Sequence, residues 1–165
     1  MKFWIDIVEP FSLNFLAVVI NRLKELNHTV TITAPARQVL LSELDSKKIE
    51  YIMIDNRVNG RSRADRLGDL GRALRLAEFA LDSRFDLGFS TGSLPQTIAC
   101  NMVGLANLVI YDFSQKPPWL LLKLRTKMLV PDCIIDSLPE KIKEKVVGYP
   151  GFKESIYLGA VKYNH

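Results

Sequence analysis

Hydroxyl groups surround a glycine in the stretch Ser90-Thr91-Gly92-Ser93, which lies between an apolar run and a segment of helical character. Hydroxyls, a glycine that lets a ligand approach the backbone, and the amide groups of a helix N-terminus can together hold a phosphate or a sugar. The lysine and the spacing of a nucleoside-triphosphate P-loop are absent. We interpret the stretch as substrate-binding; an ordinary strand-to-helix turn is the alternative.

Two carboxylates and a serine lie in or just after the first apolar run. Asp6 interrupts that run, and a lone carboxylate there is costly to bury unless it is hydrogen-bonded or near the open end of a strand. It either orients neighbouring loop amides or acts as a general base. Glu9, the second candidate catalytic carboxylate, and Ser12, a candidate substrate-binding residue, are placed to meet sugar hydroxyls. The alternative is a plain turn in which Ser12 caps the helix.

Arginines are concentrated in one part of the chain. Six of them fall within nineteen residues: Arg57, Arg61, Arg63, Arg66, Arg72 and Arg75. A guanidinium group can bind a diphosphate through two parallel hydrogen bonds, so Arg61 and Arg63 are candidate substrate-binding residues. A solvated helix entrance is the alternative. Asp112, which follows an apolar run, is a further candidate substrate-binding residue.

Other chemistry is excluded by what the sequence lacks. The stretch WIDIVEPFSLNFLAVVI contains no glycine, whereas the dinucleotide fingerprint needs glycines there, so we expect no NAD or FAD and no other cofactor. The two histidines, His28 and His165, lie in a helix-to-strand turn and at the end of the sequence. Cys100 and Cys133 are far apart in apolar segments, which predicts two reduced core thiols and no metal site.

The elements that carry these residues are predicted from alternating apolar and helical patterns, which indicate a parallel sheet with crossover helices. The predicted strands are residues 3–8, 29–33, 51–54, 87–89, 108–111 and 133–135. The predicted helices are residues 13–26, 37–47, 67–83, 95–103 and 119–130. A strand order of 3-2-1-4-5 would bring the loops after the first and fourth strands together at one crevice.

The third predicted helix carries one apolar stripe, made of Leu67, Leu70, Leu74, Ala77 and Leu81. A stripe of this kind normally faces the core, so Arg72, Arg75 and Asp82 are expected to face solvent. Asn27 is expected to end the first helix in a left-handed conformation.

Several motifs, taken in order, resemble an archaeal and bacterial family that is catalogued as a domain of unknown function. They are WIDI with a proline turn, LNHTVTITA, FSTGS, IYD and YPGFKESIYL, and the match runs from Met1 to about Leu158. Members of that family resemble GT-B glycosyltransferases and UDP-N-acetylglucosamine epimerases, in which two Rossmann-like halves face each other across a cleft. The N-terminal half usually receives the acceptor and the C-terminal half holds the nucleotide sugar.

The resemblance implies a fold and two possible functions. We expect a single α/β, Rossmann-like, three-layer domain over residues 1–148, similar to the N-terminal half, and a hinge-like tail over 149–165. The implied function is the acceptor-side half of a GT-B-like glycosyltransferase system, which needs a donor-binding half on another chain. Relatives carry histidines after the first strand and this sequence does not. A non-catalytic module that binds a phosphorylated sugar, a lipid head group or a protein partner therefore stays open.

Charge and hydropathy limit the partners. A net charge of +4 is mild, so nucleic acid is not expected. No window is apolar enough to span a bilayer and the N-terminus does not resemble a signal peptide, which favours a cytoplasmic location. The cationic, apolar segment from Trp119 to Val130 is a candidate for peripheral contact with a membrane that carries a lipid-linked acceptor. Its alternatives are a core helix and a surface for the missing half; a homo-oligomer is also possible.

Overall fold

Seven parallel strands form one sheet in the computed structural model, which describes residues 1–55, 66–111 and 123–158. The strands are β1 (Lys2–Asp6), β2 (Thr29–Ala34), β3 (Ile52–Met53), β4 (Leu87–Ser90), β5 (Asn107–Ile110), β6 (Lys127–Pro131) and β7 (Val146–Tyr149). Their order is β3-β2-β1-β4-β5-β6-β7. The predicted order 3-2-1-4-5 is confirmed, and the sheet extends by two further parallel strands.

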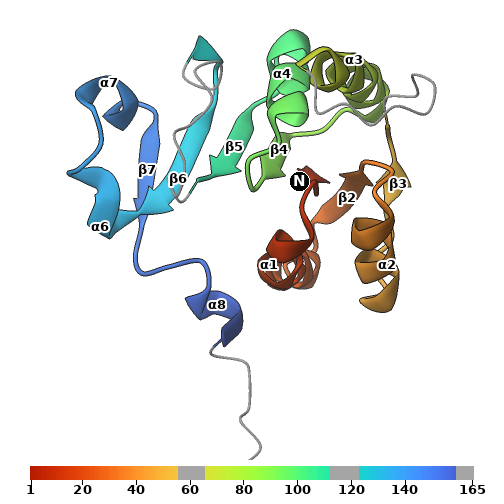
Figure 1. Ribbon diagram of the computed structural model, residues 1–165, viewed down its shortest axis with the longest axis horizontal. Helices are drawn as coiled ribbons and strands as arrows, with labels where there is room; N and C mark the ends of the chain where they lie inside the picture. Colours follow the sequence, from red (N-terminus) through yellow and green to blue (C-terminus); the bar gives the residue numbers. More distant parts are fainter. Residues whose placement is uncertain (56–65, 112–122, 159–165) are drawn as a thin grey trace, which may run out of the picture.

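Helices cover both faces of this sheet (Figure 1). They are η1 (Pro10–Ser12), α1 (Leu13–Glu25), α2 (Gln38–Ser46), α3 (Arg66–Ser83), α4 (Leu94–Val103), α6 (Asp132–Ile135), α7 (Glu140–Lys143) and α8 (Ser155–Leu158). In Figure 1, α1 and α2 lie below the strands and α3 and α4 above them. The α/β three-layer architecture expected from the sequence is therefore present.

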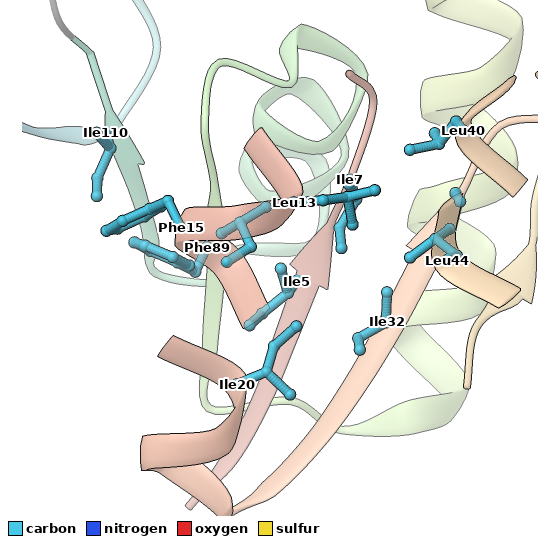
Figure 2. Close-up of a cluster of buried hydrophobic side chains, with 12 residues drawn as sticks. Ile5, Ile7, Leu13, Phe15, Ile20, Ile32, Leu40, Leu44, Phe89 and Ile110 are labelled. Atoms are coloured by element: carbon cyan, nitrogen blue, oxygen red, sulfur yellow. The ribbon is translucent and has the colours of Figure 1, made fainter. Parts of the chain in front are cut away.

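The alternation of side chains along β1 separates the two main parts of the core. Ile5 points into the cluster formed with α1 and α2, which Figure 2 shows in close-up. Its neighbour Trp4 points to the opposite face, where it packs against Leu76 of α3 and stacks on Phe85 at a ring-centroid distance of 5.6 Å. Because successive strand residues point to opposite faces, one apolar strand holds both helical layers.

The C-terminal part of the sheet differs from the prediction. Residues 133–135 were expected to form a strand, but they belong to α6, and the strand is Lys127–Pro131. The predicted helix over 119–130 is accordingly wrong at its end; residues 119–122 lie outside the described part. Met128 and Val130 alternate with more exposed neighbours, which is strand behaviour, and Pro131 closes the strand. The boundary predicted at residue 148 falls within β7, and that division stays a prediction.

The buried face of α3 is also not the predicted one. Of the predicted stripe, Ala77 is buried as expected, but Leu70, Leu74 and Leu81 are exposed. Arg72 was expected to face solvent and is instead buried, together with Ala73, Leu76 and Ala80. Small alanine side chains allow α3 to pack closely, and it makes most of its helix contacts with α4. Arg75 and Asp82 face solvent as expected, and the side chain of Leu67 lies outside the described part.

The two ends of α1 and the two cysteines were also predicted from the sequence, and these predictions are confirmed only in part. Asn27 ends α1 with a φ of 60°, as predicted. Ser12 occupies the cap position of α1 but makes no capping bond, because its hydroxyl donates to the carbonyl of Glu9. Cys100 is buried, but Cys133 is exposed because it lies on α6 rather than in a strand; both thiols are free. No helix within the described ranges is long and apolar enough to cross a membrane.

Candidate functional site

A buried ion pair lies at the carboxyl end of β1. Asp6 is completely buried. Its two carboxylate oxygens accept hydrogen bonds from the two terminal guanidinium nitrogens of Arg72, a residue of α3, at 2.8 and 2.7 Å. The hydroxyl of Thr33 donates to one carboxylate oxygen at 2.6 Å, and the hydroxyl of Ser93 donates to the other at 2.5 Å. Four donors therefore surround two oxygens, which offsets much of the cost of burying the charge.

This network joins α3 to the ends of three strands and to the start of α4. Thr33 lies on β2 and accepts a hydrogen bond from the indole of Trp4 at 2.9 Å. The Nε of Arg72 donates to the carbonyl of Ile54, just beyond β3, at 2.8 Å. Ser93 precedes α4 and accepts a hydrogen bond from the amide of Gln96, which makes it the cap of that helix. The ends of β1, β2 and β3 and the start of α4 are thus held by one side-chain cluster.

The two interpretations of Asp6 can be weighed against this geometry. A general base needs a lone pair that a substrate proton can reach. The Asp6 carboxylate is inaccessible to solvent and its oxygens already accept four hydrogen bonds, so the geometry favours the structural interpretation. Its catalytic role stays a prediction without geometric support.

The negative charge of Asp6 also acts on a nearby thiol. Burial, and secondarily the charge of Asp6, raise the pKa of Cys100 to about 12. A thiol with so high a pKa carries almost no thiolate at neutral pH, and the thiolate is the nucleophilic form. Cys100 is therefore a core residue rather than a nucleophile.

The Ser90–Ser93 loop is anchored at both ends and open in its middle. The Ser90 hydroxyl accepts a hydrogen bond from the amide of Ser93 at 3.2 Å, and both side chains are buried. Between them, Gly92 has a φ of 98°, and a Cβ added there would meet no atom within 4 Å. The Thr91 hydroxyl oxygen is buried and has no hydrogen-bond partner within the described residues. The backbone at Gly92 is therefore the part of the loop that a ligand can approach.

The loop after β1 presents a charged pair at the same edge. Arg37 donates to the Glu9 carboxylate at 2.8 Å and to the carbonyl of Val8 at 3.0 Å. Both side chains are about half exposed, so this ion pair holds Glu9 only weakly and leaves it accessible. Phe11 is exposed beside it, whereas Ser12 is buried with its hydroxyl turned to a backbone carbonyl. Glu9 is accessible to a ligand here, but Ser12 is not.

The structure brings together part of the predicted site. Asp6 and Ser93 touch, and Glu9 follows on the same strand end, whereas Arg61, Arg63 and Asp112 lie outside the described residues. Arg72 and Arg37 were not predicted as partners of the two carboxylates. A buried Asp6 itself signals a cationic partner, but nothing in the sequence singled out which arginine supplies it. Across the described ranges, no group of three or more metal-ligating side chains is present.

Comparison with known proteins gives a fold. No family model and no curated protein matches the sequence. A solved UDP-N-acetylglucosamine 2-epimerase matches with a TM-score of 0.73 and 14% identity over 100% of this chain and 52% of that one. MurG of Acinetobacter baumannii matches with a TM-score of 0.71 and 14% identity, over 92% and 46% of the chains. A glycosyltransferase of Rickettsia africae ESF-5 gives 0.63 and 18%, over 90% and 42%.

The matches cover very different shares of the two chains compared. The chain spans about half the length of the solved structures that it matches, and it does so over nearly all of its own length. These neighbours are GT-B glycosyltransferases and UDP-N-acetylglucosamine 2-epimerases. The chain is a single α/β domain with the fold of one half of a GT-B protein.

Proposed function

We propose that the chain is the acceptor-side half of a GT-B-like glycosyltransferase system, and that transfer needs a donor-binding half supplied separately. One observation carries the proposal. In a fold that forms only one half of its solved neighbours, the Asp6 network holds the two loops of the carboxyl edge around an open backbone at Gly92. Ligands of open parallel sheets bind at this edge, where the strand order reverses between β1 and β4.

The accessible residues of this edge would divide the work. The backbone at Thr91 and Gly92, next to the N-terminus of α4, would hold the phosphate of a phosphorylated sugar or lipid-linked acceptor. Glu9 would accept the proton of the acceptor hydroxyl. The oxygen of that hydroxyl would form the new bond to the anomeric carbon of the donor sugar, and the bond from this carbon to the nucleotide diphosphate would break. Arg61 and Arg63 are proposed to bind a diphosphate of the acceptor.

The test begins with finding the other half. The tagged chain is captured from lysate of its source organism, and the co-purifying proteins are identified by mass spectrometry. A stoichiometric partner with a nucleotide-sugar domain is then purified, and both chains are mixed with radiolabelled UDP-N-acetylglucosamine and membrane lipids. We expect label transfer only with both chains present. Transfer by this chain alone, or none by the reconstituted pair with any nucleotide sugar, contradicts the proposal.

A second function is favoured by the saturation of the Asp6 carboxylate. With Asp6 committed to Arg72 and no histidine in the first loop, Glu9 is the accessible carboxylate of the loop after β1. A module that only binds a phosphorylated sugar, a lipid head group or a protein would need no base. Glu9→Gln separates the two functions because it removes the base and keeps the shape.

The Glu9 variant has a matched control. In an enzyme half, Glu9→Gln lowers kcat of the reconstituted system by about a hundredfold or more, the usual contribution of a general base. Glu25→Gln removes a carboxylate at the far end of α1, where it makes only an exposed ion pair with Arg22, and should leave kcat unchanged. Equal activity of both variants favours the binding module.

A further inference from the structure

Cationic side chains gather at the amino ends of β6 and β7. They belong to two segments of the chain, residues 123–127 and 140–145, which together we call the basic edge. Its six cations are Lys123, Arg125, Lys127, Lys141, Lys143 and Lys145, and its two acids are Glu140 and Glu144. The basic edge therefore has a formal net charge of +4, equal to that of the whole chain. All other residues together have no net charge, so the positive charge of the protein is concentrated here.

The fold brings the two segments together. β6 and β7 are parallel neighbours, so both begin at the same side of the sheet, where α7 leads into β7 (Figure 1). The ammonium of Lys127 donates to the carbonyl of Glu144 at 3.1 Å, and that of Lys145 donates to the carbonyl of Leu124 at 2.8 Å. A carbonyl carries no net charge, so these hydrogen bonds hold the lysines at the edge without neutralising them.

The carboxylates of the basic edge offset only part of its charge. Glu140 pairs with Lys143 at 3.2 Å, but the side chain of Glu140 is 87% exposed, so water screens the pair. Asp132, the next acid after Lys127 along the chain, follows the other end of β6, about 16 Å away along the strand. Four of the cations are exposed: Lys123, Arg125, Lys127 and Lys141. An anionic partner would therefore meet an accessible cluster of cations.

The basic edge lies opposite the proposed ligand site. Glu9 and the Ser90–Ser93 loop follow the carboxyl ends of β1 and β4, whereas the basic edge includes the residues that precede β6 and β7. Because these strands belong to one parallel sheet, the two regions lie at opposite ends of the strands. A partner bound at the basic edge therefore leaves the ligand site open.

The chemistry of the basic edge fits a membrane surface better than it fits nucleic acid. Five of its six cations are lysines, which act as point charges, and neither segment contains an aromatic residue. Binding of nucleic acid favours arginine forks and aromatic rings that stack on bases. Met102, at the end of α4, is 53% exposed, and its neighbour Asn101 is joined to the backbone of Arg125 by hydrogen bonds of 2.6 and 3.3 Å. Cations beside an exposed apolar side chain suit a bilayer, where the cations meet lipid phosphates and the apolar group enters the interface.

The structure changes which residues of the segment from Trp119 to Val130 can meet a membrane. Met128 and Val130 are completely buried and form a core cluster with Leu138 and Ile142, so these two apolar side chains are not accessible. The described part of the segment contributes its cations instead.

We propose that the basic edge binds a membrane surface that carries anionic lipids, with Met102 entering the interface between head groups and acyl chains. One lysine or arginine close to such a surface strengthens binding by roughly fivefold, so attachment needs several of them together. The attraction falls off within about 10 Å at about 0.1 M salt, so cations elsewhere on the domain contribute little. The contact needs no donor-binding half and is therefore independent of the proposed glycosyltransferase function.

Vesicle flotation with the purified chain tests the contact. Vesicles of phosphatidylcholine are compared with vesicles that also contain about 30% phosphatidylglycerol, at about 0.1 M salt. We expect binding to the anionic vesicles and little binding to the neutral ones. Raising the salt to about 1 M should release most of the chain, because it shortens the range of the attraction.

Two double variants that remove equal charge locate the contact. Arg125→Gln with Lys141→Gln removes two exposed cations of the basic edge and should weaken binding to the anionic vesicles at least about tenfold. Lys47→Gln with Lys48→Gln removes two exposed cations that precede β3, at the opposite side of the sheet from β7, and should weaken it less than about threefold. Met102→Ser keeps the charge and should weaken binding about threefold with the same salt dependence.

Circular dichroism and the unfolding midpoint show whether the variants are folded. The proposal is overturned if the chain does not bind the anionic vesicles, if it binds the neutral vesicles equally well, or if the two double variants have the same effect. Binding of duplex RNA by a chain that does not bind the vesicles at the same salt concentration would assign the basic edge to nucleic acid instead.

Discussion

Replacing Arg72 with methionine should destabilise the domain far more than the loss of a surface charge. The change keeps most of the side-chain length but leaves the Asp6 carboxylate, which has no solvent exposure, without its cation. Breaking a buried pair in this way typically costs about 3–5 kcal/mol, because the remaining charge is uncompensated. Domains are stable by only about 5–15 kcal/mol, so the loss is a large fraction of the total. In a domain of this size it lowers the unfolding midpoint by roughly 10 °C.

The double variant Asp6→Asn with Arg72→Met separates the ion pair from the packing of the arginine. A buried neutral amide costs less than a buried lone carboxylate, and it can still accept from Thr33 and donate to the Ser93 hydroxyl. We therefore expect the double variant to be more stable than Arg72→Met alone. The coupling energy of the cycle should be at least about 2 kcal/mol.

Urea unfolding followed by circular dichroism and by tryptophan fluorescence gives these free energies, and the buried Trp4 reports directly on this region. Arg22→Met is the matched control, because its ion pair with Glu25 is exposed and should be worth less than about 1 kcal/mol. A loss below about 1 kcal/mol for Arg72→Met, or additive effects of the two substitutions, would refute this account of Asp6 as a scaffold residue.

Three other predictions concern the loop and the thiols. Ser93→Ala should lower stability by about 1–2 kcal/mol in thermal unfolding, because it removes the cap of α4 and one donor to the buried carboxylate. Gly92→Ala and Gly104→Ala both place a side chain at a positive φ, at 98° and 72°, and each should lower the free energy of unfolding by about 1 kcal/mol. Only Gly92→Ala should lower transfer in the reconstituted system. Equal activities of the two variants would exclude the Ser90–Ser93 loop from the site. At pH 8, a thiol reagent should modify Cys133 rapidly and Cys100 only after unfolding. Fast modification of both thiols would show that Cys100 is accessible. Burial raises the pKa of Cys100 in the folded state to about 12. The contribution of the protonated thiol to stability is therefore present below the ordinary pKa of about 8.5 and is lost as the pH rises toward 12, which urea unfolding between pH 7 and 10.5 can follow.

The order of the first five strands could be predicted from the sequence pattern and from a general rule of strand connection. β1, β2, β4 and β5 are apolar runs separated by helical patterns, and the right-handed crossover rule leaves few ways to arrange them. β7 has no such signal, since it is a short edge strand with two exposed residues at its centre. The Lys127–Pro131 strand was predicted as the end of a helix because it continues the apolar and cationic segment that begins at Trp119, and its pairing with β5 shows that it is a strand.

The error in α3 has a physical cause that sequence periodicity cannot reveal. The helix carries two stripes, one of leucines and one of alanines, and hydrophobicity alone favours the leucines. The fold buries the alanine stripe because close packing on α4 needs small side chains, and because Arg72 must reach Asp6 from that side. The leucine stripe is then left on the surface.

Burial of the Asp6 network limits which groups at the carboxyl ends of the strands can contact a ligand. Asp6, Thr33, Ser90 and Ser93 are buried and committed to one another, so they determine the shape of the carboxyl edge without meeting a ligand. The accessible groups are the backbone at Gly92 and the carboxylate of Glu9. In the proposed reaction, Glu9 is the first candidate for the proton acceptor. If Glu9→Gln leaves kcat of the reconstituted pair unchanged, the base belongs to the partner chain or to a segment outside the described residues, and this half acts by holding the acceptor.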